Sequence, residues 1–292
     1  MAFHEGLAAH LASGATTVCH AWAITRADGV VLGFTDHDRT LAFEGVVFRA
    51  DTGLSALALQ QGTGLSVDNS EAIGALSDAG LREADIDAGR FDGAEVTCWL
   101  VNWAEVTERQ VLFRGSIGEI RRAGGAFTAE LRGLSEALNR PMGRVYQKPC
   151  GAVLGDADCG VDLTAPGYVV EAEVVAVREA TVWVAALPDF EPGWFARGEL
   201  IVLDGAAAGL SGVVKRDVSE DGRRFDLWQE LRAGVVAGDR VRVTAGCDKR
   251  MGACRYKFDN LLNYRGFPDI PGEDWLAAVP SVAGQTTGGS RR

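Results

Sequence analysis

Residues 245–255 read AGCDKRMGACR and place Cys247 and Cys254 in a glycine-bearing loop, with six residues between the two cysteines. A second pair, Cys150 and Cys159, has eight residues between its members and also lies beside glycines. The two pairs are separated by 87 residues. Four thiols in two loops can converge on one soft metal centre. Such a centre would hold together the two ends of the chain segment that lies between the pairs.

The composition favours a protein rich in β structure. The chain has 292 residues, 47% of them hydrophobic, so one large domain or two ordinary domains with a buried core are expected. It contains 37 glycines and short helical patterns at residues 3–12 and 81–86, with one or two further turns at 134–139. Most of the remaining chain consists of strand patterns separated by turns.

The net charge of −11 argues against a nucleic-acid clamp, because DNA affinity comes mainly from basic groups. No basic stretch followed by an apolar run opens the chain. No run of about 18 uninterrupted apolar residues occurs, so stable membrane insertion is not expected. Folding in the cytosol keeps thiols reduced, which makes metal ligation more probable for the cysteine pairs than disulfide formation.

Strand patterns occupy both halves of the chain. In the first half they lie at 19–24, 30–34, 41–43, 46–48, 95–103, 111–113, 117–122 and 127–132. In the second half they lie at 169–177, 181–185, 199–203, 212–218, 225–228 and 240–244. The second set indicates a small barrel or sandwich inserted between the cysteine pairs. Residues 52–92 are rich in Gly, Ser and Asp, and the Gly/Thr/Ser-rich end at 283–292 is expected to be disordered.

The spacing of the cysteines leaves the bound metal open. Paired ligands of structural zinc sites usually have about two to four residues between them, fewer than in either pair here. Iron–sulfur clusters also take four thiolates and tolerate longer loops, which wrap a larger object. Disulfides and unrelated buried cysteines remain alternatives. The run at 260–272, dense in aromatic residues, Gly and Pro, follows the second pair and is expected to cover the site.

Two further cysteines and one polar cluster have simpler interpretations. Cys19 and Cys98 lie inside strand patterns, where a lone cysteine usually acts as a small core hydrophobe. The cluster Asp36-His37-Asp38 could hold a metal or supply a base, but it directly follows a strand, where aspartates commonly order turns. The sequence contains none of the motifs of serine hydrolases, P-loop proteins or Rossmann enzymes. We therefore predict no catalytic residue.

Two sets of motifs resemble families of phage proteins. The run FTDHD at 34–38 and the sequence VDN at 67–69 resemble the DUF2163 family. The closing run at 246–272, which includes GAC, KF and NYRGFPDIPG, resembles the C-terminal domain of the BR0599-type family. Together they cover nearly the whole chain. The combination is similar to the hub, or baseplate, proteins of gene transfer agents and siphophage-like tails, and more distantly to the minor tail protein L of lambdoid phages.

This resemblance implies a structural protein of a tail tip. It implies an iron–sulfur cluster of the 4Fe–4S type, with zinc as the alternative, at the matching positions Cys150, Cys159, Cys247 and Cys254. It also implies a homotrimeric ring between the ring of distal tail proteins and a central fibre or megatron-type tail protein. The tape measure protein is a further implied partner, and DNA passes through the channel without specific binding.

We therefore expect a mainly β chain with a β-barrel or β-sandwich hub domain. The expected divisions are a hub domain at 1–145, a cysteine-bearing metal-binding segment at 146–167 and 245–280, an inserted small β module at 168–244, and a flexible tail at 281–292. The expected function is a non-enzymatic hub that lines the DNA channel of a virion or virus-like tail tip assembled in the bacterial cytoplasm. The alternatives are a tail-associated hydrolase using Asp36-His37-Asp38 and a redox iron–sulfur protein, which would need a second cofactor motif that is absent.

Overall fold

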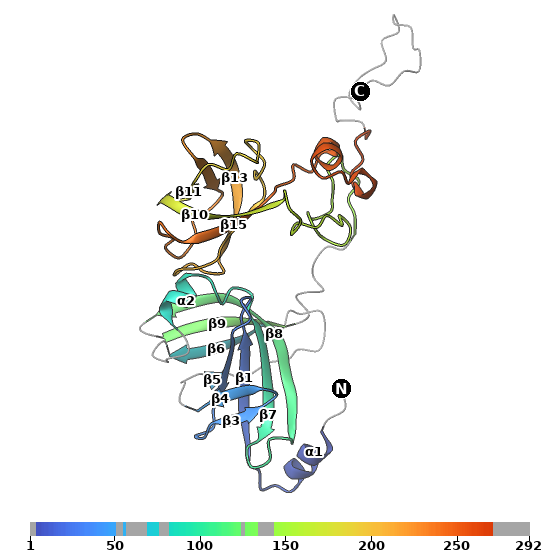
Figure 1. Cartoon of the computed structure of the whole chain (residues 1–292). Coiled ribbons are helices and arrows are strands. Elements are labelled where there is room, and N and C mark those ends of the chain that lie inside the picture. Colours follow the sequence, from blue (N-terminus) through green and yellow to red (C-terminus); the bar gives the residue numbers. More distant parts are fainter. Residues whose placement is uncertain are drawn as a thin grey trace, which may run out of the picture. The chain divides into compact units, whose positions relative to one another are not determined.

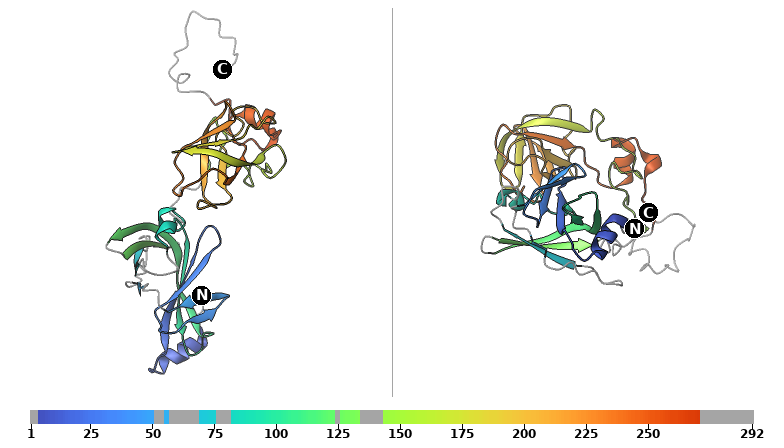
Figure 2. Two further views of the ribbon diagram at one scale, coloured as in Figure 1. Left: turned by 60° about the vertical axis from the view of Figure 1, so that its left-hand side comes forward. Right: turned by 90° about the horizontal axis from the view of Figure 1, so that it is seen from below.

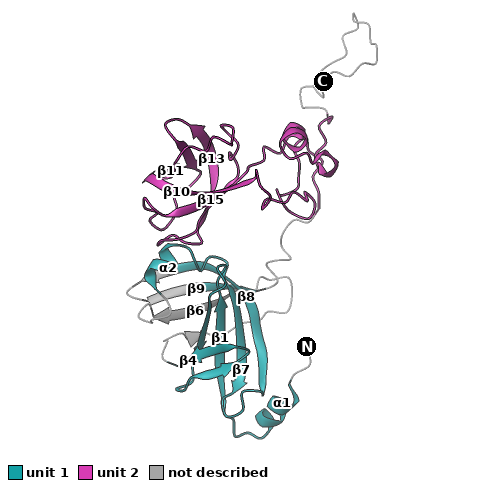
Figure 3. Cartoon of the chain, viewed as in Figure 1, with its two compact units in different colours: residues 1–141 teal, residues 142–292 magenta. Residues whose placement is uncertain are grey.

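The structure is a computed structural model, and it describes residues 4–50, 55–56, 69–75, 82–123, 126–133 and 143–270. The chain divides into two compact units, Met1–Pro141 and Met142–Arg292, which Figure 3 shows in separate colours. Both units are built mainly from antiparallel strands, so the predicted mainly β class is confirmed. Within the described ranges, no helix has the length and apolar character needed to cross a membrane.

A nine-stranded sheet forms the first unit, with the strand order β3-β4-β2-β1-β7-β8-β9-β6-β5 (Figure 1). Neighbouring strands pair antiparallel, except that β2 and β4 run parallel. The strands are β1 (Val18–Thr25), β2 (Val31–Thr35), β3 (Leu41–Phe43), β4 (Val46–Arg49), β5 (Ser55–Ala56), β6 (Asn69–Ala75), β7 (Glu95–Asn102), β8 (Arg109–Ala123) and β9 (Ala126–Gly133). The described residues of this unit also form the helices α1 (Glu5–Ala12) and α2 (Glu83–Asp87).

Strand β1 is covered on both faces and lies near the middle of the sheet. Trp22 and Ile24 belong to one buried apolar cluster, whereas the alternating Ala21 and Ala23 belong to another. Successive side chains of a strand point to opposite faces, so two apolar layers pack against the same strand. The neighbouring strand β7 also contributes to both clusters. The core of the unit is therefore divided between the two faces of its central strands.

The predicted N-terminal helix is confirmed as α1. The Nδ1 atom of His4 caps it by accepting a hydrogen bond from the Leu7 amide at 3.3 Å, and Leu7 is completely buried. The helix predicted at 81–86 corresponds to α2, which begins two residues later. The helical turns predicted at 134–139 and the tail at 283–292 lie outside the described residues.

Three strands of the first unit, β5, β6 and β8, differ from the sequence prediction. The separate strands predicted at 111–113 and 117–122 are one continuous strand, β8. Gly115 lies between the two predicted strands, and a Cβ atom there would lie 2.1 Å from the carbonyl oxygen of Arg132, so the glycine permits a close approach of β9. Strands β5 and β6 were not predicted, because Ile73 is the single β-branched residue in the two strands.

The second unit contains a closed barrel of six strands with the order β10-β11-β14-β13-β12-β15 (Figures 1 and 2). Its strands are β10 (Val169–Arg178), β11 (Thr181–Val184), β12 (Glu199–Val202), β13 (Ser211–Ser219), β14 (Arg223–Leu227) and β15 (Arg240–Thr244). All six correspond to strands predicted between the cysteine pairs. The predicted small barrel or sandwich is therefore a closed barrel.

The barrel core consists mainly of aliphatic side chains, with two aromatic rings and one buried ion pair beside them. Phe195 and Phe225 are completely buried and meet edge to face, with ring centroids 5.8 Å apart. Arg223 forms an ion pair with Asp217 and donates to the Phe190 carbonyl oxygen at 2.8 Å. The Phe195 amide donates to Asp217 Oδ2 at 2.8 Å. The pair thereby joins β13 and β14 to the loop that precedes β12.

Residues 143–167 and 246–270 flank the barrel in the sequence and meet in space. The Cys150 amide, in the first segment, donates to the carbonyl oxygen of Lys249, in the second, at 2.7 Å. The second segment contains a π-helix, η1 (Ala253–Lys257), and a 3-10 helix, η2 (Leu261–Asn263). These two segments carry the paired cysteines.

Candidate four-cysteine metal site

The four paired cysteines line one small cavity of the second unit. Cys150 and Cys159 reach it from the first segment, and Cys247 and Cys254 reach it from the second. The pKa of Cys254 reflects this closeness, because burial raises it and the three other thiols raise it further. The apolar part of the wall consists of Ala152, Leu154, Val161 and Phe258. The structure thus brings together all four residues predicted as ligands.

The first cysteine loop is folded around Asp156. One carboxylate oxygen of Asp156 accepts a hydrogen bond from the Cys159 amide at 2.7 Å, and the other accepts one from the Val153 amide at 2.8 Å. These hydrogen bonds lower the pKa of the Asp156 carboxyl, and the one from the Cys159 amide has the larger effect. The Cys150 sulfur accepts a hydrogen bond from the Arg265 amide at 3.4 Å. Hydrogen bonds therefore hold the backbone of Cys159 and the sulfur of Cys150.

The second cysteine loop holds its two thiols in different ways. The Cys247 sulfur accepts a hydrogen bond from the Lys249 amide at 3.3 Å. Cys254 lies in η1, a helix type that is rare and frequently occurs at functional sites. Its thiol donates to the carbonyl oxygen of Asn260 at 3.0 Å. That contact needs the thiol proton, so a metal-bound Cys254 thiolate must give it up.

Side chains that were not predicted as site residues tie the two loops together. Lys249 Nζ donates to the Ala152 carbonyl oxygen at 2.6 Å, and the Tyr264 hydroxyl donates to the Lys148 carbonyl oxygen at 2.6 Å. The Asn260 side chain likewise donates to the Cys159 carbonyl oxygen at 2.6 Å. Tyr264 and Asn260 belong to the run at 260–272, which was expected to cover the site, and Tyr264 lines the cavity. The sequence signal that pointed to these residues was the position of the run at 260–272 immediately after the second cysteine pair.

The donor chemistry of the cavity fits a soft metal centre. All six cysteines of the chain are free thiols, and thiolates are ligands of zinc and of iron–sulfur clusters. Backbone N–H groups already donate to two of the four sulfur atoms. As the side chains stand, no three metal-binding residues among those described are arranged around a point that could hold a metal ion. Metal binding therefore requires the gathered thiols to turn toward a common centre.

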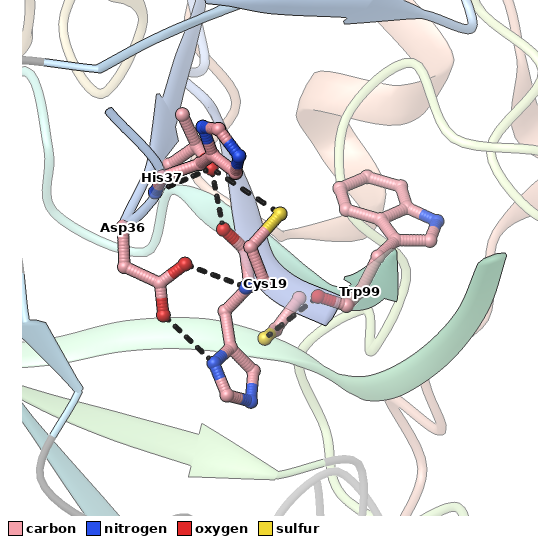
Figure 4. A network of polar contacts seen from close by, with 7 residues as sticks. Cys19, Asp36, His37 and Trp99 are labelled. Carbon is pink, nitrogen blue, oxygen red and sulfur yellow. Dashed lines mark hydrogen bonds and ion pairs between the residues drawn. The ribbon is translucent and has the colours of Figure 1, made fainter. Parts of the chain in front are cut away.

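The cluster Asp36-His37-Asp38 orders the turn after β2. Asp36 accepts hydrogen bonds from the backbone amide of His20 at 2.7 Å and contacts its ring nitrogen at 2.9 Å. The His37 Nδ1 atom lies 2.6 Å from Asp38, and the ring packs edge-on against Trp103 with centroids 4.8 Å apart. Figure 4 shows Asp36 and His37 taking different directions. Each side chain thus has a local structural partner.

The two remaining cysteines are core residues, as predicted. Cys19 is 7% exposed and Cys98 is completely buried, and they belong to the clusters on opposite faces of the first sheet. Burial raises the pKa of the Cys19 thiol to about 11 and also raises that of Cys98. Both groups therefore stay protonated at neutral pH, which favours packing over reactivity.

Family models match both parts of the chain, with bounds that differ from those of the two compact units. The family model described as "Baseplate hub protein, N-terminal attachment domain" matches residues 4–162, and "Phage conserved hypothetical protein BR0599" matches residues 193–274. A solved structure described as "Virion of native gene transfer agent (GTA) particle" contains a chain 57% identical, with a TM-score of 0.90; the match covers 98% of this chain and 99% of that one. No curated protein matches the sequence. The two family matches together include all four cysteines of the cavity.

Proposed function

This chain belongs to the family of phage baseplate hub proteins, and we propose that it is a structural hub at the tail tip of a gene transfer agent particle. The observation that carries the proposal is the 57% identity to a chain of such a virion over 98% of this chain. The family match to the N-terminal attachment domain supports it independently. The role is non-enzymatic, since the most enzyme-like cluster, Asp36-His37-Asp38, is engaged in ordering a turn.

In this proposal the cavity thiols Cys150, Cys159, Cys247 and Cys254 hold an iron–sulfur cluster of the 4Fe–4S type, with zinc as the alternative. A cluster bound there supplies metal–thiolate bonds between the two segments and performs no catalysis. The segments flank the barrel in the sequence, so linking them closes a loop of roughly 100 residues. On the estimate used for disulfides, such a closure stabilises the fold by about 4–5 kcal/mol. The cysteines then link the two segments at the point where the chain enters and leaves the barrel.

The proposed partners follow from the place of a hub in a tail. The chain forms a homotrimeric ring between the ring of distal tail proteins and a central fibre or megatron-type protein, and it contacts the tape measure protein. DNA crosses the channel of the ring without specific binding. The net charge of −11 supports this part of the proposal, because nonspecific DNA affinity depends on basic groups.

A producing strain that lacks this chain tests the proposed role. We expect particles whose tails lack a complete tip in electron micrographs, loss of gene transfer, and rescue of both by the wild-type chain. The His37→Ala variant should rescue equally well, because His37 has no catalytic role. Complete, transfer-competent particles without the chain would overturn the proposal. Normal assembly combined with lost delivery in His37→Ala would favour the tail-associated hydrolase instead.

A further inference from the structure

Asn260 contacts one cysteine of each pair. Its side-chain Nδ2 donates to the Cys159 carbonyl oxygen at 2.6 Å and lies 3.8 Å from the Cys159 sulfur. Its backbone amide donates to the Cys254 carbonyl oxygen at 2.8 Å, and its own carbonyl oxygen accepts the Cys254 thiol at 3.0 Å. One residue therefore connects the first cysteine loop to the π-helix that carries Cys254.

A second asparagine fixes the direction of the Asn260 amide. Asn263 Nδ2 donates to Asn260 Oδ1 at 2.7 Å, and the Asn263 backbone amide donates to the Asn260 carbonyl oxygen at 3.1 Å. With its oxygen engaged by Asn263, the Asn260 side chain presents its two N–H donors to Cys159. One donor serves the Cys159 carbonyl oxygen and the other faces the sulfur.

We propose that Asn260 is a positioning residue for the metal centre bound by the four cysteines, and that it sets both how tightly the centre is held and its reduction potential. This inference rests on the proposed iron–sulfur cluster. A neutral carboxamide is a poor ligand for a soft metal, so Asn260 acts through Cys159 and Cys254. An N–H donor beside a ligand sulfur withdraws electron density from it, which favours the reduced form of a cluster.

Two Asn260 variants and one control test the proposal in the full chain, reconstituted anaerobically with iron and sulfide. Asn260→Asp keeps the side-chain size and the acceptor for Asn263 but removes the donor that faces Cys159. Asn260→Ala removes the whole side chain. Leu262→Ala is the matched control, because Leu262 lies in the same segment and is 97% exposed. Two quantities are measured: iron transfer to a chelator, followed by visible absorbance, and the midpoint potential.

We expect both Asn260 variants to take up iron and sulfide but to hold iron about ten- to hundredfold more weakly than wild type. Their midpoint potentials should both be lower than that of wild type, while Leu262→Ala behaves as wild type. The midpoint potential separates the proposed role from ordinary packing, because a packing defect weakens iron retention, whereas loss of an N–H donor beside a ligand sulfur lowers the potential. The exposed Leu262→Ala control shows whether any substitution in this segment has the same effects.

Two results contradict different parts of the account. Wild-type iron retention and potential in both Asn260 variants would overturn the positioning role and leave the cluster assignment intact. A wild-type chain that takes up neither iron nor sulfide would overturn the cluster, and the positioning role with it. If Asn260→Ala does not fold, Asn260→Leu takes its place, because Leu is neutral, similar in size and has no N–H donor, whereas the negative charge of Asn260→Asp lowers the potential by itself.

Discussion

Asp217 and Arg223 place two opposite charges inside the barrel, with side chains that are 0% and 1% exposed. Removing two charges from water is costly unless their remaining polar atoms are also satisfied. Arg223 meets this condition by donating to the carbonyl oxygens of Phe190 and Glu191, and Asp217 meets it by accepting from the Phe195 amide. Loss of one partner would leave the other buried without compensation.

The Asp217→Ala variant should therefore destabilise the barrel by about 3–5 kcal/mol. Urea unfolding of the full chain, followed by circular dichroism and tryptophan fluorescence, measures the change. Glu171→Ala is the matched control, because Glu171 and Arg242 form an ion pair in which both side chains are 45% exposed. Its effect should stay below about 1 kcal/mol. Equal effects of the two substitutions would show that the buried pair contributes little.

Residues of the cavity differ in how far the sequence alone could predict them. The cysteines were predictable, because four thiols in two glycine-bearing loops form a recognisable pattern. Asn260 was not predictable as a positioning residue, because a single asparagine has no comparable spacing signal. Its partner Cys159 is 101 residues away in the chain, so the contact depends on the complete fold of the second unit.

At the scale of elements, short helices depend on their contacts. Helix α2 has five residues, too few to be stable alone. Its Asp85 pairs with Arg26 at 3.3 Å, and Arg26 also pairs with Asp28 in the turn between β1 and β2. Arg90 pairs with both carboxylates, at 3.6 Å from Asp28 and 3.2 Å from Asp85. This network fastens the helix to the hairpin.

The network makes stability depend on pH through Asp28. Burial raises the pKa of Asp28, but hydrogen bonds from Arg26 and the Val30 amide, with the charges of Arg26 and Arg90, lower it overall. A carboxyl with a lowered folded-state pKa stabilises the fold above its unfolded value of about 3.9, and this contribution is lost as pH falls through the folded value. Asp28→Asn should therefore unfold at a lower temperature than wild type at pH 7. Thermal unfolding of both proteins from pH 7 to pH 3 checks this. A difference in unfolding temperature that does not shrink below about pH 4 would contradict it.

Helix η1 connects the cysteine cavity to the loop before β12. Lys257, at its end, donates to the carbonyl oxygens of Trp194 and Gly246 and lies 4.5 Å from the Trp194 ring centroid. Lys257→Met should destabilise this junction by about 1.5–3 kcal/mol, because hydrogen bonds from a charged group are lost. Hydrogen exchange of residues 246–258 should then be faster. Arg255→Met, at an exposed position of the same helix, is the control. Equal exchange rates in both variants would contradict the role of Lys257 in holding η1 to the loop before β12.

Elements with a strong alternating pattern were predicted well, and elements shaped by close backbone contact were not. The hairpin of β3 and β4 follows directly from two apolar runs around the Glu44-Gly45 turn, where both residues have positive φ. The continuity of β8 depends on Gly115, whose role is visible only when β9 lies beside it. A glycine in a sequence does not reveal whether it marks a turn or a close approach.

At the scale of the whole molecule, the fold class was predictable but barrel closure was not. The barrel closes because β10 pairs with β15, with Val169 opposite Thr244. Such pairings join distant parts of the chain and leave no local pattern in the sequence. The 57% identity to a chain of a gene transfer agent virion gives the protein its biological setting. In the proposed function, the cavity cysteines join the segments that precede and follow the barrel strands in the sequence.

The most direct test of this account is a combined measurement of iron, zinc, acid-labile sulfide and the visible spectrum on the full chain purified anaerobically. The account predicts iron and sulfide in equal amounts, with visible absorption that is lost in Cys254→Ser. Stoichiometric zinc without acid-labile sulfide, or the absence of any bound metal, would contradict an iron–sulfur joint in this hub protein.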